Sequence, residues 1–294
     1  AARLQADQAQ VMTVRRVLDD FLVSYEPTVA PKTYAWARQL LTDPALAELD
    51  GKPAAEVTRG DAFALLEGMQ DRPVAAGKIR QLLGAAWDRA LDAGHLGEEV
   101  PNWWRQVLRG KLRSRGKIVG GEHQGAPVKR VLSEAELAKL IPWLPNFPRD
   151  IEDALTLTLW TACRGAEVVG MQASELTDEA DGLWWTLPAA KRKTRRSADA
   201  SDLRVPLVGR AEALVRRRLD AAATDWLFPG RVADHIAQKV LGVAVWTHMP
   251  DCKLRPDWAR PRLPVADWAP HDLRRTARTL LGALGCPAEV ADAH

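Results

Sequence analysis

Residues 270–281 read Pro-His-Asp-Leu-Arg-Arg-Thr-Ala-Arg-Thr-Leu-Leu, a stretch in which arginines alternate with apolar residues. If a helix begins at Pro270, its 3.6-residue period places five apolar residues on one face, namely Leu273, Ala277, Leu280, Leu281 and Leu284. The opposite face then carries four cationic or titratable residues, namely His271, Arg274, Arg275 and Arg278. No acidic residue follows Asp272 to neutralise these arginines, and a helix start offers free backbone N–H groups. The stretch therefore predicts a surface that binds an anion, and phosphate fits best.

Length and composition predict a globular protein of two domains. The chain has 294 residues, of which 47% are hydrophobic and 27% charged, with a net charge of +3. It contains no run of about 18 apolar residues, and Ala1–Gln10 is too polar for a signal peptide, so no membrane association is expected. Three cysteines without Cys-x-x-Cys spacing, Cys163, Cys252 and Cys286, argue against disulfides and zinc and favour a cytoplasmic location.

The first half of the chain has helical periodicity and few strand signals. Four amphipathic helices are predicted, the first with Val14, Val17, Leu18, Phe21 and Leu22 as its apolar stripe, the others over residues 31–41, 62–69 and 75–93. Thr58 caps the third helix and Gly94 ends the fourth. Residues 1–115 are therefore predicted to form a small helical bundle.

A strongly basic segment follows this bundle. Between residues 104 and 130 there is one acid, Glu122, against eight cations, namely Arg105, Arg109, Lys111, Arg113, Arg115, Lys117, Lys129 and Arg130. Four glycines in this segment (Gly116, Gly120, Gly121 and Gly125) are expected to prevent regular structure, so residues 116–130 are interpreted as an extended linker. Such a linker is either a strap that crosses a phosphate backbone or a solvated tether.

Helical and strand signals are mixed in residues 131–294. Ser133 and Glu136 form a capping box, and the apolar helix 151–161 leads to Arg164 at a helix junction where Gly165 breaks the pattern. Strands are predicted at 183–187 and 203–207, with a basic hairpin tip between them at residues 190–197. Helices are predicted at 210–219 and 233–245, followed by an ordered loop over residues 250–270 that is packed by Trp258 and Trp268.

The order of these features resembles the tyrosine recombinase (phage integrase) family. The resemblance rests on Thr161–Glu167 at the helix junction, Pro188–Lys193 before Arg204–Leu207, Leu227–Pro229 and His271–Thr276. It implies a mainly α fold, in which a four-helix core-binding domain (1–115) and a linker (116–130) precede the catalytic domain (131–294). That catalytic domain is expected to be mixed α/β, mostly helical, with a small antiparallel sheet.

By this resemblance the catalytic residues are Arg164, Lys193, His271 and Arg274. Two planar guanidinium groups suit the non-bridging oxygens of a phosphodiester, where charge accumulates during in-line attack. A lysine on a hairpin can deliver a proton to the departing 5′ oxygen, and Lys191 is the nearest competitor of Lys193 for this role. Glu167 is expected to orient Arg164, and Asp272 to support the site.

The resemblance also implies double-stranded DNA as the partner and a homotetramer on paired DNA sites. A monomer, when free or truncated, is the open alternative. The residues predicted to contact DNA are cationic: Lys191, Arg192, Arg195, Arg196, Arg275, Arg278, Arg113, Arg115 and Lys117. No metal or other cofactor is implied, because the arginines supply the charge neutralisation.

The family's nucleophile is a tyrosine downstream of the His-x-x-Arg pair, and this sequence has no match for it. Its two tyrosines, Tyr25 and Tyr34, have the spacing of core residues in the bundle. The catalytic domain is therefore expected to be C-terminally incomplete at His294 and this fragment inactive, or else the protein is a natural non-catalytic relative. The functions left open are a site-specific recombinase or integrase, a type IB topoisomerase-like enzyme, and a DNA-binding regulator.

Overall fold

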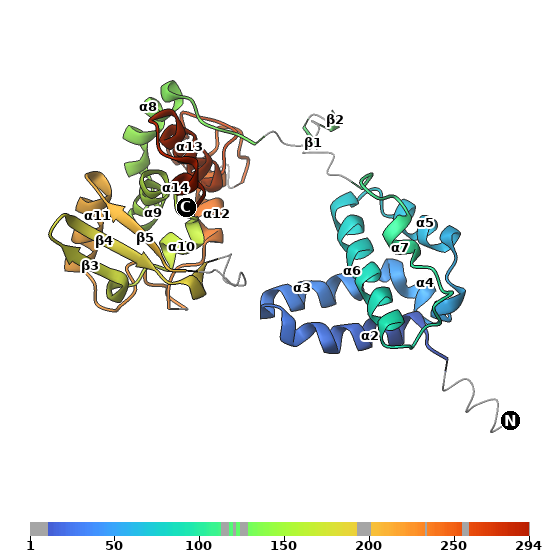
Figure 1. Ribbon diagram of the computed structural model, residues 1–294. Helices are drawn as coiled ribbons and strands as arrows, with labels where there is room; N and C mark the ends of the chain where they lie inside the picture. The colour runs from blue at the N-terminus through green and yellow to red at the C-terminus, as the bar shows by residue number, and fades with distance from the viewer. Residues whose placement is uncertain are drawn as a thin grey trace. The chain divides into compact units, whose positions relative to one another are not determined.

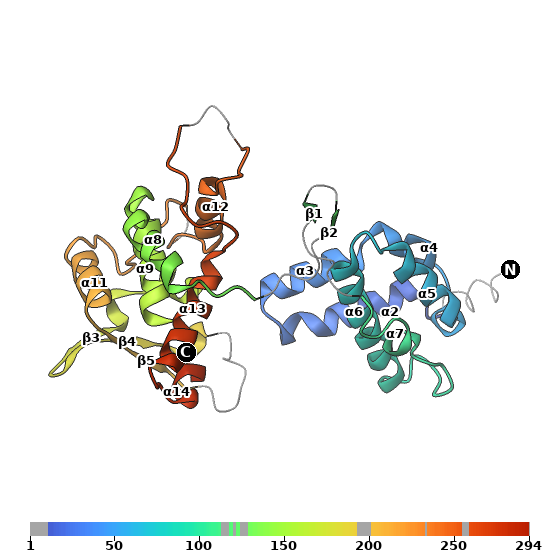
Figure 2. The same ribbon diagram turned by 90° about the horizontal axis from the view of Figure 1, so that it is seen from above.

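The computed structural model describes residues 11–112, 118–119, 122–123, 129–192, 201–232, 234–254 and 259–293. The chain divides into two compact units, residues 1–127 and 128–294 (Figures 1 and 2). The predicted assignment of residues 1–115 to DNA binding and residues 131–294 to catalysis stays a prediction.

The first unit is helical. Its α-helices are α2 (Val14–Tyr25), α3 (Pro31–Leu41), α4 (Ala47–Asp50), α5 (Arg59–Gly68), α6 (Pro73–Asp92) and α7 (Trp103–Gln106). The predicted stripe of α2 is buried, and α6 packs against α2, α3 and α7. Buried Trp87 and Trp104 meet edge to face at 5.6 Å between ring centroids, where α6 contacts α7. The four predicted helices are confirmed, and α5 begins with the capping box of Thr58 and Asp61.

The predicted linker contains a short piece of regular structure. Strands β1 (Ile118–Val119) and β2 (Glu122–His123) pair antiparallel, with Ile118 opposite His123. The expectation that glycines prevent regular structure there was therefore wrong for these four residues. The β-branched Ile118 and Val119 favour extended backbone, which explains a ladder between glycines. The predicted DNA contacts Arg113, Arg115 and Lys117 lie outside the described residues.

The second unit combines seven described α-helices with a small sheet. Its helices are α8 (Glu134–Trp143), α9 (Arg149–Thr161), α10 (Gly165–Val169), α11 (Arg210–Asp220), α12 (Lys239–His248), α13 (Pro270–Ala283) and α14 (Ala288–Ala293). Strands β3 (Leu176–Glu179), β4 (Gly182–Leu187) and β5 (Leu203–Leu207) form an antiparallel sheet with β4 in the centre. This confirms the predicted fold class, mainly helical with a small antiparallel sheet.

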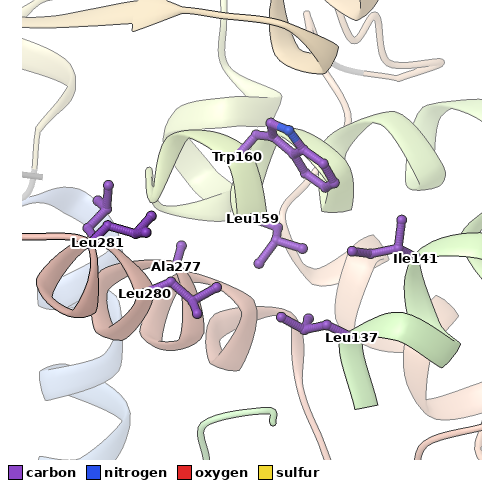
Figure 3. A pocket seen from close by; sticks show the side chains of 8 residues that line it. Leu137, Ile141, Leu159, Trp160, Ala277, Leu280 and Leu281 are labelled. Carbon is purple, nitrogen blue, oxygen red and sulfur yellow. The ribbon is translucent and has the colours of Figure 1, made fainter. Parts of the chain in front are cut away.

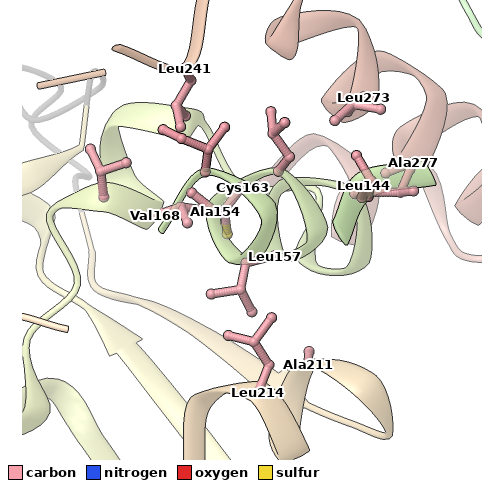
Figure 4. Close-up of a cluster of buried hydrophobic side chains, with 14 of the residues drawn as sticks. Leu144, Ala154, Leu157, Cys163, Val168, Ala211, Leu214, Leu241, Leu273 and Ala277 are labelled. Atoms are coloured by element: carbon pink, nitrogen blue, oxygen red, sulfur yellow. The ribbon is translucent and has the colours of Figure 1, made fainter. Parts of the chain in front are cut away.

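Helix α9 lies at the centre of this unit. Residues 151–159 of α9 are all buried, and α10, α11, α12 and α13 pack against the helix. Figure 4 shows Ala154 and Leu157 of α9 among side chains of α10, α11 and α13. The core around α9 therefore fixes the position of α13 relative to the start of α10.

Two sequence expectations in this unit were wrong, and one strand was missed. Helix α12 begins at Lys239 and not near residue 233, because His235 pairs with Pro229 in an isolated bridge and holds that segment extended. Strand β3 was not predicted. Leu284, predicted on the buried face of α13, is 83% exposed, because the helix ends at Ala283 and the chain turns away.

Candidate functional site

The junction between α9 and α10 is a sharp turn at Ala162. Ala162 follows the last residue of α9 and has φ 55°, a left-handed conformation that is uncommon for a residue with a Cβ. Arg164 is the N-cap of α10, and Gly165 is its first residue. The junction was predicted correctly, but the residue that breaks the helix is Ala162 and not Gly165. The turn brings Arg164 to the start of α10 with its side chain partly exposed.

Glu167 holds Arg164 through two contacts. Its Oε1 accepts a hydrogen bond from Nη1 of Arg164 at 2.7 Å, and its Oε2 accepts one from the Arg164 backbone N–H at 2.7 Å. The Glu167 side chain is only 3% exposed, whereas that of Arg164 is 28% exposed. A buried carboxylate that accepts a hydrogen bond from one edge of a guanidinium leaves the N–H donors on the other edges available for an oxyanion. The geometry agrees with the predicted orienting role of Glu167.

Arg274 reaches the same junction from α13. Its Nη1 donates to the backbone carbonyl of Ala162, and the residue is only 4% exposed. The sequence placed Arg274 on the exposed face of its helix, and this was wrong because α9 covers that part of α13. Burial, followed by the charge of Arg164, lowers the pKa of Arg274.

His271 lies at the start of α13, one turn before Arg274. Burial lowers its pKa, and the charges of Arg275, Arg274 and Arg164 lower it further, while Asp272 acts in the opposite direction. A lowered pKa favours the neutral imidazole at pH 7, which is the form that accepts a proton. His271 therefore belongs to the same electrostatic cluster as the two arginines.

Asp272 stabilises the helix start on which these residues lie. Its Oδ2 accepts the backbone N–H of Ala269 at 2.8 Å, and its Oδ1 accepts from Nη1 of Arg275 at 2.5 Å. The supporting role predicted for Asp272 thus has a structural counterpart, and Arg275 is already paired within its own helix. Arg278, one turn after Arg274, is partly exposed.

Comparisons with known proteins bear on the fold of the chain. Neither a scan against protein-family models nor a search of curated proteins finds a match. Among solved structures, the Tn1549 transposon integrase in complex with circular intermediate DNA has a TM-score of 0.68 and 14% identity, covering 96% of this chain and 91% of that chain. A lambda integrase tetramer bound to a Holliday junction gives 0.67 and 15%, covering 99% and 79%. A lambda integrase dimer bound to a core site gives 0.65 and 15%, covering 96% and 94%.

The chain has the integrase fold. The similarity extends over both units, since the coverage of this chain is 96–99% in these three comparisons. At 14–15% identity it establishes the fold, and the roles of individual residues rest on the geometry of the site.

The predicted catalytic lysine, Lys193, lies outside the described residues, as do Arg195 and Arg196. Lys191 and Arg192 are described, and both contact the chain itself. Nζ of Lys191 donates to the carbonyl of Gly170 at 2.9 Å, and Nη1 of Arg192 donates to the carbonyl of Ser201 at 2.8 Å. Contacts of these residues with DNA stay predictions.

Cys163 is adjacent to Arg164 but is not a candidate nucleophile. It is fully buried, and burial raises the pKa of its thiol to about 12, so the thiol stays protonated at neutral pH. This confirms the prediction that Cys163 is a small buried residue.

An apolar pocket lies on another part of the same unit. Figure 3 shows it between Leu137 and Ile141 of α8, Leu159 and Trp160 of α9, and Leu280 of α13. The volume of the pocket is about 250 Å³. Its lining is apolar and aromatic, so it lacks the charges that phosphate chemistry needs.

None of the described helices has the length and apolar character that a membrane crossing requires. Within the described ranges, no three His, Cys, Asp or Glu side chains gather as a metal site would require.

Sequence reasoning missed two parts of the site. The Ala162 carbonyl was missed because a backbone acceptor leaves no trace in the sequence. Glu175, which contacts Lys191, was missed because a single carboxylate before an unpredicted strand gives no pattern.

Proposed function

We propose that this protein is a site-specific recombinase of the tyrosine recombinase family, which cuts and rejoins DNA through a 3′-phosphotyrosyl intermediate. The observation that carries the proposal is the hydrogen bond from Arg274 of α13 to the Ala162 carbonyl, two residues before Arg164, with His271 one turn earlier on α13. Two guanidinium groups held in fixed geometry suit the non-bridging oxygens of a scissile phosphate. The integrase fold supports the proposal, since the lambda and Tn1549 integrases were solved in complexes with DNA.

In the proposed reaction a tyrosine hydroxyl attacks the phosphorus in line with the 5′ oxygen. The P–O bond to the tyrosine forms as the bond to the 5′ oxygen breaks, and the phosphodiester energy is conserved in the protein–DNA bond. In this proposal neutral His271 accepts the hydroxyl proton, and Lys193 protonates the departing 5′ oxygen. Attack of a 5′ hydroxyl on the phosphotyrosine reverses these steps and rejoins the strand.

The two tyrosines of this chain are poor candidates for that nucleophile. Tyr25 stacks on Phe21 at 5.0 Å between ring centroids, and Tyr34 packs against the core of the first unit. The proposal therefore assigns the nucleophile to a tyrosine outside this sequence. Assembly as a homotetramer on paired sites is part of the same proposal, in line with the lambda integrase tetramer on a Holliday junction.

Trapping of the covalent intermediate tests the function. The full-length protein is incubated with nicked duplexes that carry its recombination site, so that the cut 5′ fragment diffuses away and religation is prevented. A covalent protein–DNA adduct that disappears when a C-terminal tyrosine is changed to phenylalanine is the expected result. Tight binding without an adduct would instead assign the protein to the DNA-binding regulators, and relaxation of supercoils without site preference would assign it to topoisomerases.

Substitution of Arg274 tests the role of the arginine pair. Arg274→Ala should weaken DNA binding by about 1.5–3 kcal/mol, the value of a charge-assisted hydrogen bond, and should slow cleavage by roughly a further 100-fold. Arg274→Lys keeps the charge but loses the planar fork, so it should bind DNA well and still cleave slowly. Arg216→Ala is the control for loss of an arginine, because Arg216 pairs with Glu212 and Asp178 and is not among the predicted DNA contacts. Equal losses of binding and cleavage in Arg274→Ala would contradict a catalytic role.

A further inference from the structure

Lys191 is held at the base of the segment that joins β4 to β5. Its ammonium donates to the carbonyl of Gly170 at 2.9 Å and to Oε1 of Gln172 at 2.5 Å, and it forms an ion pair with Glu175. It also lies 5.0 Å from the ring centroid of Trp226, within cation–π distance. Two of the three donors of the ammonium are thus used in hydrogen bonds, and the Glu175 carboxylate balances its charge. Lys191 thus serves as an internal anchor in this conformation.

Glu175 connects this anchor to the centre of the sheet. Its side chain is 6% exposed, and its Oε2 accepts from the indole N–H of Trp185 at 3.0 Å and from the backbone N–H of Gln172 at 3.2 Å. Trp185 is fully buried on the central strand β4. A carboxylate buried in this way destabilises the fold unless its charge is compensated, and Lys191 supplies the compensation.

Gln172 is itself held in place. Its side-chain N–H donates to Oδ2 of Asp225 at 2.6 Å, which directs its carbonyl oxygen to Lys191. Asp225 in turn accepts from the backbone N–H and the hydroxyl of Ser174 at 2.9 and 2.8 Å. The groups that accept hydrogen bonds from Lys191 are therefore held in place by hydrogen bonds of their own.

The same anchor is connected to Arg164 through α10. Arg164 is the N-cap of this helix, and Gly170, whose carbonyl binds Lys191, is its C-cap. At 1.5 Å per helical residue, the two ends of α10 are roughly 9 Å apart. The position of Lys191 is thereby fixed relative to an arginine of the candidate site.

We propose that Glu175 and Lys191 are positioning residues, which fix the point where the chain leaves the sheet on its way to Lys193. The inference rests on the proposed function, in which Lys193 protonates the 5′ oxygen. Lys193 follows Lys191 by two residues, and consecutive Cα atoms are 3.8 Å apart, so the anchor limits where that lysine can reach. Arg192, the residue after Lys191, donates a hydrogen bond to the carbonyl of Ser201, shortly before β5 begins.

Replacement of the leaving oxygen by sulfur isolates this effect. A thiolate is a much better leaving group than an alkoxide and departs without a proton, so a substrate with sulfur at the bridging 5′ position does not need the acid. A defect in placing Lys193 should slow cleavage of the oxygen substrate only. A defect in folding or in binding the phosphate should slow both.

The experiment compares the full-length protein with Glu175→Gln and Lys191→Met on nicked duplexes carrying either bridging atom. We expect both variants to lose about 10- to 100-fold in cleavage rate on oxygen, part of what a general acid contributes, and less than about 3-fold on sulfur. Lys193→Ala should show the same pattern with a larger loss. Glu212→Gln is the matched control, because Glu212 pairs with Arg216 at the surface of α11. This variant should cleave both substrates at the normal rate.

Two further outcomes complete the test. Lys191→Arg retains the charge and should recover most of the oxygen rate, and thermal melting checks that each variant is folded. Equal losses on both substrates, in folded variants, would overturn the positioning role while leaving the recombinase function intact. If the unchanged protein forms no adduct with either substrate, the proposed function itself is wrong and the inference falls with it.

Discussion

The two units of the chain differ in what they bury. In the described part of the first unit every buried side chain is apolar, and its ion pairs, such as Arg15 with Asp19, lie near the surface. The second unit buries charged side chains as well, namely Glu152, Asp153, Glu167, Glu175, Asp272 and Arg274. A buried charge destabilises the fold unless it has a partner. We therefore interpret these buried charges as a sign of function rather than of stability. Three of the six lie at the candidate site, and Glu175 holds the lysine anchor.

The largest effect predicted from this comparison concerns Asp153. Its side chain is 3% exposed and pairs with Arg217 at 2.6 Å and Arg218 at 2.8 Å. Asp153→Ala leaves the largely buried Arg218 with fewer partners, and we expect the free energy of unfolding of the second unit to fall by about 3–5 kcal/mol. Because two units need not unfold together, hydrogen exchange of the α9 amides is the appropriate measurement.

Asp19→Ala in the first unit is the matched control. Asp19 is 63% exposed and pairs with Arg15 one turn away, so its removal should cost at most about 0.5 kcal/mol. Similar losses for Asp153→Ala and Asp19→Ala would show that the difference in burial between the units has no energetic meaning.

An intermediate effect is expected at Asp61 in the first unit. Its carboxylate accepts from Nζ of Lys52 at 2.6 Å and from the backbone and hydroxyl of Thr58 at 2.7 and 2.8 Å, which lowers its pKa to about 2. A lowered carboxyl pKa stabilises the fold above the usual value of 3.8, and this contribution is lost as pH falls through about 2. Asp61→Asn should cost about 1 kcal/mol at neutral pH and flatten the acid unfolding curve of the first unit. The acid unfolding curve of the unchanged protein is the reference. An Asp61→Asn curve identical to it between pH 4 and 2 would contradict the prediction.

The smallest effect is expected at His271 in the second unit. Because its pKa is lowered in the folded state, the unfolded chain binds a proton more readily, so stability falls as pH drops below the usual value of 6.5. His271→Gln should remove this part of the pH dependence without changing stability at pH 8. NMR titration of the His271 ring provides a direct check, and a midpoint above 6.5 would refute the assignment.

Much of the fold could be predicted because one-sided burial leaves a period in the sequence. The stripe Val14 to Leu22 is buried as expected, and the capping box at Ser133 does begin α8. Strand β3 could not be predicted in the same way. Its sequence Leu-Thr-Asp-Glu is mostly exposed and polar, and pairing with β4 makes it a strand. The start of α12 likewise depends on the bridge between Pro229 and His235.

The site was predicted in composition but not in geometry. Arg164 and Arg274 were identified from motifs 110 residues apart, yet the helical period alone placed Arg274 on an exposed face. Its burial depends on the packing of α13 against α9, a tertiary contact that the helical period does not reveal. The Lys191 anchor was missed for the same reason, since Gln172, Glu175 and Trp226 converge only after the sheet has formed.

The turn at Ala162 also has an electrostatic consequence. The aligned peptide dipoles of a helix leave a partial negative charge, equivalent to about half an electron, at its C-terminus. Helix α9 ends directly before Ala162, so this end faces Arg274, whose guanidinium contacts the Ala162 carbonyl. The positive charges of Arg164 and Arg274 repel each other. The C-terminus of α9 offsets part of that repulsion, and so helps the two side chains keep the arrangement that the proposed function requires.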